Sequence, residues 1–108
     1  MSFFGLTSFA QSTNETSPKE FAELQTKELV DYYKLSDELK ARIFEINFLC
    51  ASKVGALKAD KQMSQDVINE GIKYNYDLRD KSIQSLLNES QLNSYSEFQL
   101  KSVYNKRD

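Results

Sequence analysis

The stretch LSDELKARIFEINFLCASKVGAL, residues 35–57, decides the fold because it carries the longest regular apolar pattern in the chain. An apolar side chain recurs every three or four residues, which is the spacing of one helix face and not of a strand. The members of this face are Leu39, Ile43, Ile46, Cys50, Val54 and Leu57. Ser36 precedes the pattern as a capping residue, and Asp37 and Glu38 place negative charge in the first turn. We therefore expect a long amphipathic helix here.

Similar start signals mark further helices on either side. Ser17 and Pro18 open a helix that we expect to end near Tyr33, and Ser64 caps a helix over about residues 65–86. A fourth helix begins after Asn88 and continues toward residue 103. The chain has only three glycines and one proline, which disfavours sheets joined by tight turns. The sequence predicts an all-α fold of three to four helices, with a long antiparallel hairpin and flanking N- and C-terminal helices.

Both ends of the chain differ in composition from this helical part. Residues 1–10, MSFFGLTSFA, are apolar and uncharged and end in small residues, which is typical of the end of an export signal. The alternative is an apolar end that packs on the domain. Residues 11–17 are small and polar, as in a flexible leader, and residues 105–108 form a polar tail that we expect to fray. Residues 18–104 would then form a single helical domain.

Charge and composition argue against several functional classes. The 14 basic and 16 acidic residues alternate along the chain, so there is no basic block for nucleic acid. The chain has no histidine, the commonest general base and metal ligand. The carboxylates lie at spacings typical of exposed helix ion pairs. We therefore predict no catalytic residue, cofactor site or metal site, no membrane span, and a protein that is not an enzyme.

Apolar side chains outside the main face predict a binding surface. The candidates for contact with a client or partner protein are Phe44, Phe48, Leu49, Tyr74 and Tyr76. Phe44, Phe48 and Leu49 give the long helix more apolar surface than one antiparallel neighbour covers, which indicates a homodimer or a client-binding face. The alternative is a closed bundle that buries them.

Three further side chains lie on or beside this pattern. We expect the single cysteine, Cys50, to be a small buried residue, although a lone thiol in an exported protein can also pair between subunits. Asn47 and Asn75 lie at the edges of the apolar faces, where we expect solvent.

Two predicted turns share a pattern of a leucine followed by a capping residue. The first copy is Leu35, Ser36 and Asp37; the second keeps Leu87, Asn88 and Gln91. These turns resemble the LTxxQ motif of the Spy/CpxP family, small all-helical periplasmic proteins of Gram-negative bacteria. The first copy has Leu39 where that motif has glutamine. The order of helices and turns over residues 18–98 is also similar to that family's layout.

The resemblance implies an exported, periplasmic helical protein, dimeric in that family, that holds unfolded or misfolding client proteins during envelope stress without ATP. The alternative is a regulatory or structural module that docks one defined protein partner. Promiscuous binding of unfolded chains would favour the first hypothesis, and one saturable partner of fixed stoichiometry would favour the second. The missing histidines argue against the metal-sensing role of some family members.

Overall fold

The computed structural model describes residues 17–102, in which it has helices and no strand. This confirms the predicted all-α class. The helices are α1 (Pro18–Tyr33), α2 (Asp37–Ala59), α3 (Gln65–Gln84) and α4 (Glu89–Lys101). The predicted starts are all confirmed, while α3 and α4 end about two residues earlier than expected. The expected signal remnant, most of the leader, and the tail lie outside the described residues.

Each helix begins at the capping side chain that the sequence indicates. Ser17, Ser36 and Ser64 accept hydrogen bonds from backbone N–H groups three residues later, at 3.1–3.3 Å. Asn88 accepts from the Gln91 N–H at 2.8 Å, and the Gln91 side chain accepts from the Asn88 N–H at 2.9 Å. These bonds satisfy N–H groups that would otherwise lack partners at helix starts, which explains why sequence located the boundaries so well.

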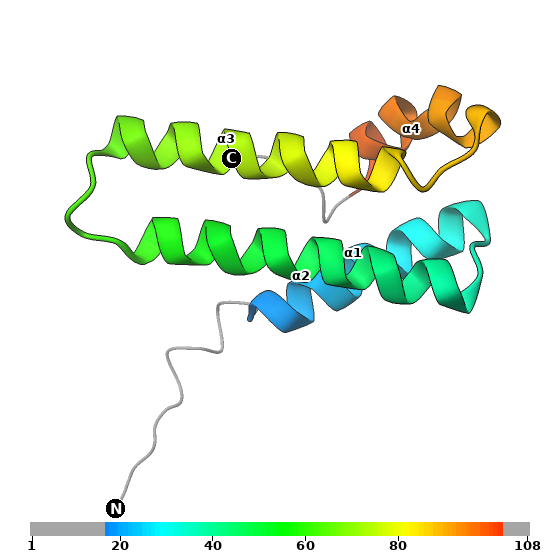
Figure 1. The fold of residues 1–108 in the computed structure, drawn as a ribbon, viewed down its shortest axis with the longest axis horizontal. Helices are drawn as coiled ribbons and strands as arrows, with labels where there is room; N and C mark the ends of the chain where they lie inside the picture. The colour runs from blue at the N-terminus through cyan, green and yellow to red at the C-terminus, as the bar shows by residue number, and fades with distance from the viewer. Residues whose placement is uncertain (1–16, 103–108) are drawn as a thin grey trace, which may run out of the picture.

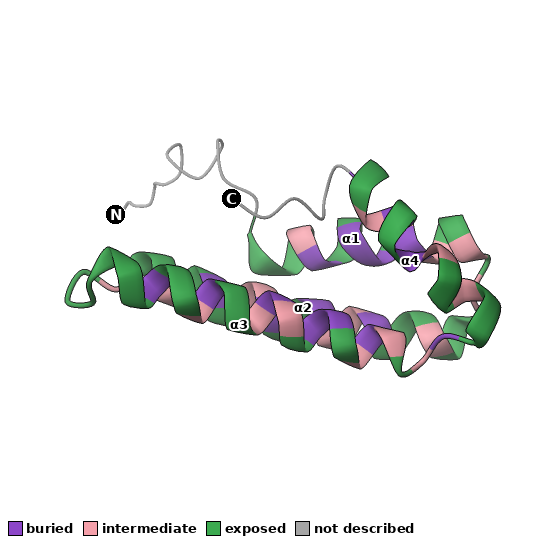
Figure 2. Ribbon diagram, turned by 90° about the horizontal axis from the view of Figure 1, so that it is seen from above, coloured by how far each residue is buried: buried purple, intermediate pink, exposed green. Residues whose placement is uncertain are grey.

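The helices form two layers. Helices α2 and α3 lie side by side and antiparallel, while α1 and α4 lie together over one end of this hairpin (Figures 1 and 2). Helix α1 packs along α2, and α4 touches α1. The other end of the hairpin, toward the α2–α3 loop, is not covered by α4 (Figure 1). The predicted hairpin with flanking helices is therefore confirmed.

The core follows this arrangement and divides into two clusters. The first joins all four helices at the covered end and contains Leu29, Ile43, Ile83, Leu87, Tyr95 and Phe98. The second lies between α2 and α3 alone and contains Cys50, Val54, Ile68, Ile72 and Tyr76. The molecule is thus a closed bundle at one end and a two-helix hairpin at the other.

The predicted apolar face of α2 is confirmed, but one of its neighbours was assigned wrongly. Asn47 is only 2% exposed, and its amide donates to the Thr26 hydroxyl at 2.9 Å. It is buried because α1 crosses α2 on this side. Asn75 is half-buried, and its amide donates to the Gly71 carbonyl. Cys50 is buried as expected, and its thiol donates to the Asn75 carbonyl.

Candidate functional site

Large apolar side chains are exposed along one side of the α2–α3 hairpin. They are Leu49 on α2 and Val67, Tyr74 and Leu78 on α3, with exposed fractions between 42% and 66%. Val67, Tyr74 and Leu78 are spaced by seven and four residues and therefore share one face of α3. We call these four residues the outer face.

The outer face points away from α1 and α4. On α2, Asn47 points at α1, and Leu49 follows two residues later, about 200° around the helix. On α3, Asp80 bonds Tyr95 of α4, and Leu78 precedes it by the same angular step of about 200°. Neither α1 nor α4 can therefore cover these side chains.

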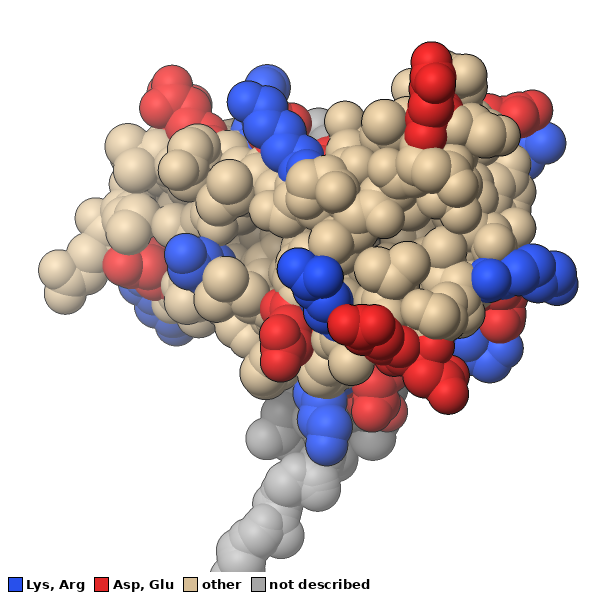
Figure 3. Space-filling model, turned by 45° about the vertical axis from the view of Figure 1, so that its right-hand side comes forward, with Lys and Arg blue, Asp and Glu red and all other residues tan. Residues whose placement is uncertain are grey.

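A shallow groove runs between α2 and α3 on this side. One hollow of about 400 Å³ and one of about 70 Å³ share Ile46, Leu49 and Ser82 as lining residues. Charged side chains on α2 border the groove, namely Arg42, Glu45 and Lys53. Figure 3 shows charged groups of both signs scattered around a broad uncharged area. The groove is thus lined by apolar and polar side chains together, with charged residues of α2 at its margin.

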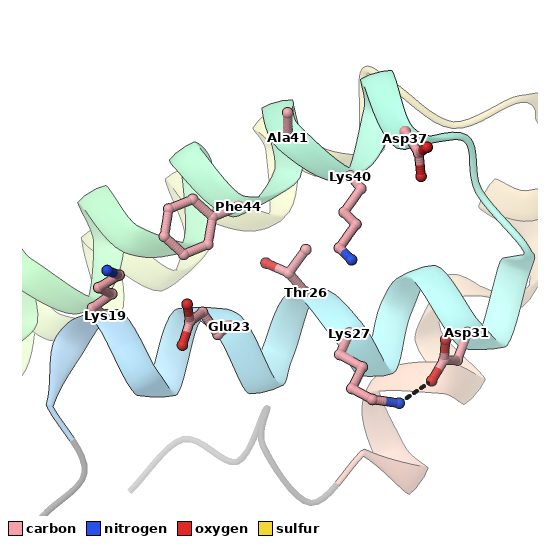
Figure 4. A pocket seen from close by; sticks show the side chains of 9 residues that line it. All are labelled: Lys19, Glu23, Thr26, Lys27, Asp31, Asp37, Lys40, Ala41 and Phe44. Carbon is pink, nitrogen blue, oxygen red and sulfur yellow. Dashed lines mark hydrogen bonds and ion pairs between the residues drawn. The ribbon is translucent and has the colours of Figure 1, made fainter.

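The predicted binding residues do not all meet on this face. Leu49 and Tyr74 belong to it, whereas Phe44 and Phe48 stack on each other elsewhere on α2, with ring centroids 5.8 Å apart. Phe48 is 41% exposed. Phe44 lines a separate groove of about 770 Å³ between α1 and α2 (Figure 4). The sequence alone could not separate the outer face from the α1–α2 groove, because the difference depends on where α1 packs against α2.

The α1–α2 groove has a more charged lining than the outer face. Lysines and carboxylates alternate along it: Lys19, Glu23, Lys27, Asp31, Asp37 and Lys40. Lys27 pairs with Asp31 at 2.7 Å, as Figure 4 shows. Their hydrogen bond raises the pKa of Lys27 and lowers the pKa of Asp31. Because this pair is exposed, it adds little stability.

Tyr76 must be removed from the candidate binding residues. It is 8% exposed and belongs to the core cluster between α2 and α3. The guanidinium of Arg79 lies over its ring, 4.9 Å from the centroid. Tyr74 and Tyr76 are two residues apart and therefore point to nearly opposite sides of α3. Only Tyr74 is available to a partner.

A buried polar network that the sequence analysis missed crosses from α3 to α4. Arg79 donates through Nε and Nη2 to Asp80 Oδ1 at 3.2 and 2.9 Å, and Tyr95 donates its hydroxyl to the same oxygen at 3.2 Å. Burial, and then the charge of Asp80, raises the pKa of Tyr95 far above its ordinary value. The sequence does contain a signal for this network, because the charged residues Arg79 and Asp80 fall between Tyr76 and Ile83 in the apolar repeat of α3.

The six motif residues lie in or directly after the α1–α2 and α3–α4 turns, at the starts of α2 and α4. Figure 1 shows both turns at the same end of the hairpin. Leu87 is part of the first core cluster, and Leu35 packs against that cluster. Ser36 and Asn88 are the caps, Asp37 opens α2, and Gln91 completes the second capping box. The Tyr33 hydroxyl donates to the Gln91 carbonyl at 2.9 Å. The repeated pattern thus fixes helix starts and anchors both turns in one core.

The family described as "Domain of unknown function (DUF4890)" matches residues 9–95. The chain belongs to this family. The match includes α1, α2 and α3 and the first half of α4. No curated protein and no solved structure matches the chain.

Within residues 17–102, no three or more cysteine and carboxylate side chains are grouped so that they could hold a metal ion. No helix in the same range combines the length and apolar character needed to cross a membrane.

Proposed function

We propose that this protein is an exported, ATP-independent binding protein of Spy/CpxP type, which holds unfolded or misfolding client proteins in the periplasm during envelope stress. The observation that carries the proposal is the outer face, where Leu49, Val67, Tyr74 and Leu78 are exposed on a helical hairpin. Large apolar side chains exposed together on one side of a fold can mark a protein-binding surface. The apolar, uncharged residues 1–10 support the exported location.

The size of the outer face suits weak and reversible holding. Burying a whole Leu or Val side chain contributes about 1.5–3 kcal/mol, and these side chains are already about half buried. The four together therefore offer a gross gain of about 4 kcal/mol. Ordering a flexible client offsets part of that gain. A client would need contacts with several of these side chains to bind, and it would dissociate readily.

The charged margin supports the same reading. Arg42, Glu45 and Lys53 border the groove and keep their charged groups in water. Mixed charges beside an apolar surface reduce association between copies of the protein while leaving the apolar centre open to unfolded chains. Such a surface selects for exposed apolar segments and not for one fold.

The test is aggregation of a denatured model enzyme, diluted with and without the full-length protein and without ATP. We expect suppression at near-stoichiometric ratios. The double variant Leu49→Gln/Leu78→Gln should lose most of it, whereas Leu100→Gln should keep it, because Leu100 is 87% exposed on α4, away from this face. Circular dichroism and thermal unfolding check that each variant folds.

No suppression over a wide excess of protein would overturn the client-holding proposal. Equal loss in the Leu100 and double variants would show that the activity depends on general surface hydrophobicity and not on the outer face. Saturable binding of one folded partner at fixed stoichiometry, without suppression, would instead support the dedicated interaction module.

A further inference from the structure

The guanidinium of Arg79 has a hydrogen-bond donor that the fold does not use. Arg79 is 2% exposed, and Nε and Nη2 bond Asp80. Nη1 is buried and has no hydrogen-bond partner among the described residues. An unpaired buried donor on a charged group is costly, so the fold is more stable when an acceptor reaches it.

Arg79 also lines the smaller hollow of the outer groove. This hollow of about 70 Å³ is bordered by the apolar side chains of Ile46, Leu49 and Leu78 and by the polar residues Cys50, Lys53, Asn75, Arg79 and Ser82. None of these lining residues is acidic. Because Nε and Nη2 are directed at Asp80, Nη1 projects from the other end of the guanidinium. Leu49 and Leu78 belong to the outer face, so the hollow opens where a client would lie.

We propose that this hollow binds a carboxylate of the client segment held on the outer face, with Arg79 Nη1 and Lys53 as the donors. This inference rests on the proposed function and specifies the client class as apolar segments that contain an aspartate or glutamate. The carboxylate would supply the acceptor that Nη1 lacks, and the neighbouring apolar residues of the client would contact Leu49 and Leu78.

Charge and size favour a carboxylate over a phosphate. Asp80 already balances the charge of Arg79, so the hollow has one uncompensated cation, Lys53, which matches a single negative charge. The volume of about 70 Å³ has room for only a few heavy atoms. A carboxylate is flat and small, and its two oxygens can accept from two donors.

The experiment compares two apolar peptides with blocked ends that differ only by a central glutamate or glutamine, using fluorescence anisotropy with the full-length protein. We expect the glutamate peptide to bind about tenfold more tightly. That preference should disappear in Lys53→Gln and weaken in Arg79→Lys, which keeps a cation beside Asp80. Lys58→Gln is the matched control, because it removes the same charge from an exposed site on another side of α2.

A second measurement does not depend on peptide binding. Acetate is titrated into the protein while the side-chain Nε–H resonance of Arg79 is followed by NMR, with Arg79→Lys providing the assignment. We expect a saturable shift that Lys53→Gln weakens and Lys58→Gln does not.

The outcomes separate the two proposals. Equal binding of both peptides overturns the carboxylate site and leaves client holding intact. If neither peptide binds, client holding fails and the acetate titration decides the site alone. No acetate-dependent shift overturns the site, because the buried donor is then not accessible to a carboxylate.

Discussion

The hydrogen bond between Thr26 and Asn47 is expected to contribute measurably to the packing of α1 on α2. Both side chains are 2% exposed, and the Asn47 amide lies 2.9 Å from the Thr26 hydroxyl oxygen. Thr26→Val keeps the shape of the side chain but leaves a buried amide donor without this acceptor. That should lower the free energy of unfolding by about 1–3 kcal/mol.

Asn47→Ala should cost about 2–4 kcal/mol, because it removes the same bond and also leaves a cavity. In the double variant the buried amide and the hydroxyl are both gone, so its cost should fall short of the sum of the single costs by about 1 kcal/mol. Urea unfolding followed by circular dichroism measures all three values. Asn69→Ala is the control, since Asn69 is exposed and its bond to Gln65 should contribute less than about 0.5 kcal/mol.

Additive costs, within about 0.3–0.5 kcal/mol, would refute this reasoning. They would mean that the two side chains do not interact across the α1–α2 interface. An equally large loss in the Asn69 control would show that the cost does not depend on the buried contact, because alanine has the higher helix propensity at both positions.

Four other variants test separate parts of the fold. Tyr95→Phe should remove an alkaline loss of stability: the folded state keeps the proton of Tyr95 because its pKa is raised, whereas the unfolded chain releases it near pH ~10. Above that pH, the free energy of unfolding of the wild type should fall by up to about 1.4 kcal/mol per pH unit more than that of Tyr95→Phe. An equal pH dependence of the two proteins, measured by urea unfolding, would contradict this. Gly55→Ala should raise the free energy of unfolding by about 1 kcal/mol, because the added Cβ would meet Pro18 Cγ at an ordinary contact distance of 4.0 Å. Gly71→Ala should gain less, because its Cβ would lie 2.8 Å from Leu57 Cδ1; a larger gain at Gly71 in denaturant unfolding would be inconsistent. Asn88→Ala removes a cap and should lower the thermal midpoint, with a cost of about 1 kcal/mol that calorimetry can detect; an unchanged midpoint would argue against the second capping box.

Local signals in the sequence were enough to place the helices. Ser17, Ser36, Ser64 and Asn88 each cap the helix that they were expected to cap. Capping depends on residues within one turn, so tertiary structure does not override it easily. The apolar face of α2 was equally clear, because its repeat continues over the whole helix.

Features that depend on where a third element packs could not be predicted. Asn47 lies beside the apolar face and looked solvent-exposed, but α1 covers it and supplies Thr26 as its partner. Arg79 and Asp80 were not singled out in the sequence, but each is buried and they pair with one another. Tyr76 was grouped with Tyr74 although they face opposite sides. The outer face could be defined only after α1 and α4 had been placed.

The central claim is that unfolded chains bind to the outer face, and site-specific photo-crosslinking tests it most directly. A benzophenone amino acid replaces Tyr74, which is 66% exposed on the outer face, or Tyr32, which is 43% exposed on α1. Each full-length protein is mixed with a denatured model enzyme and illuminated. The account predicts a strong client crosslink from position 74 and little from position 32. Equal crosslinking at both positions, or crosslinking at position 32 alone, would contradict it.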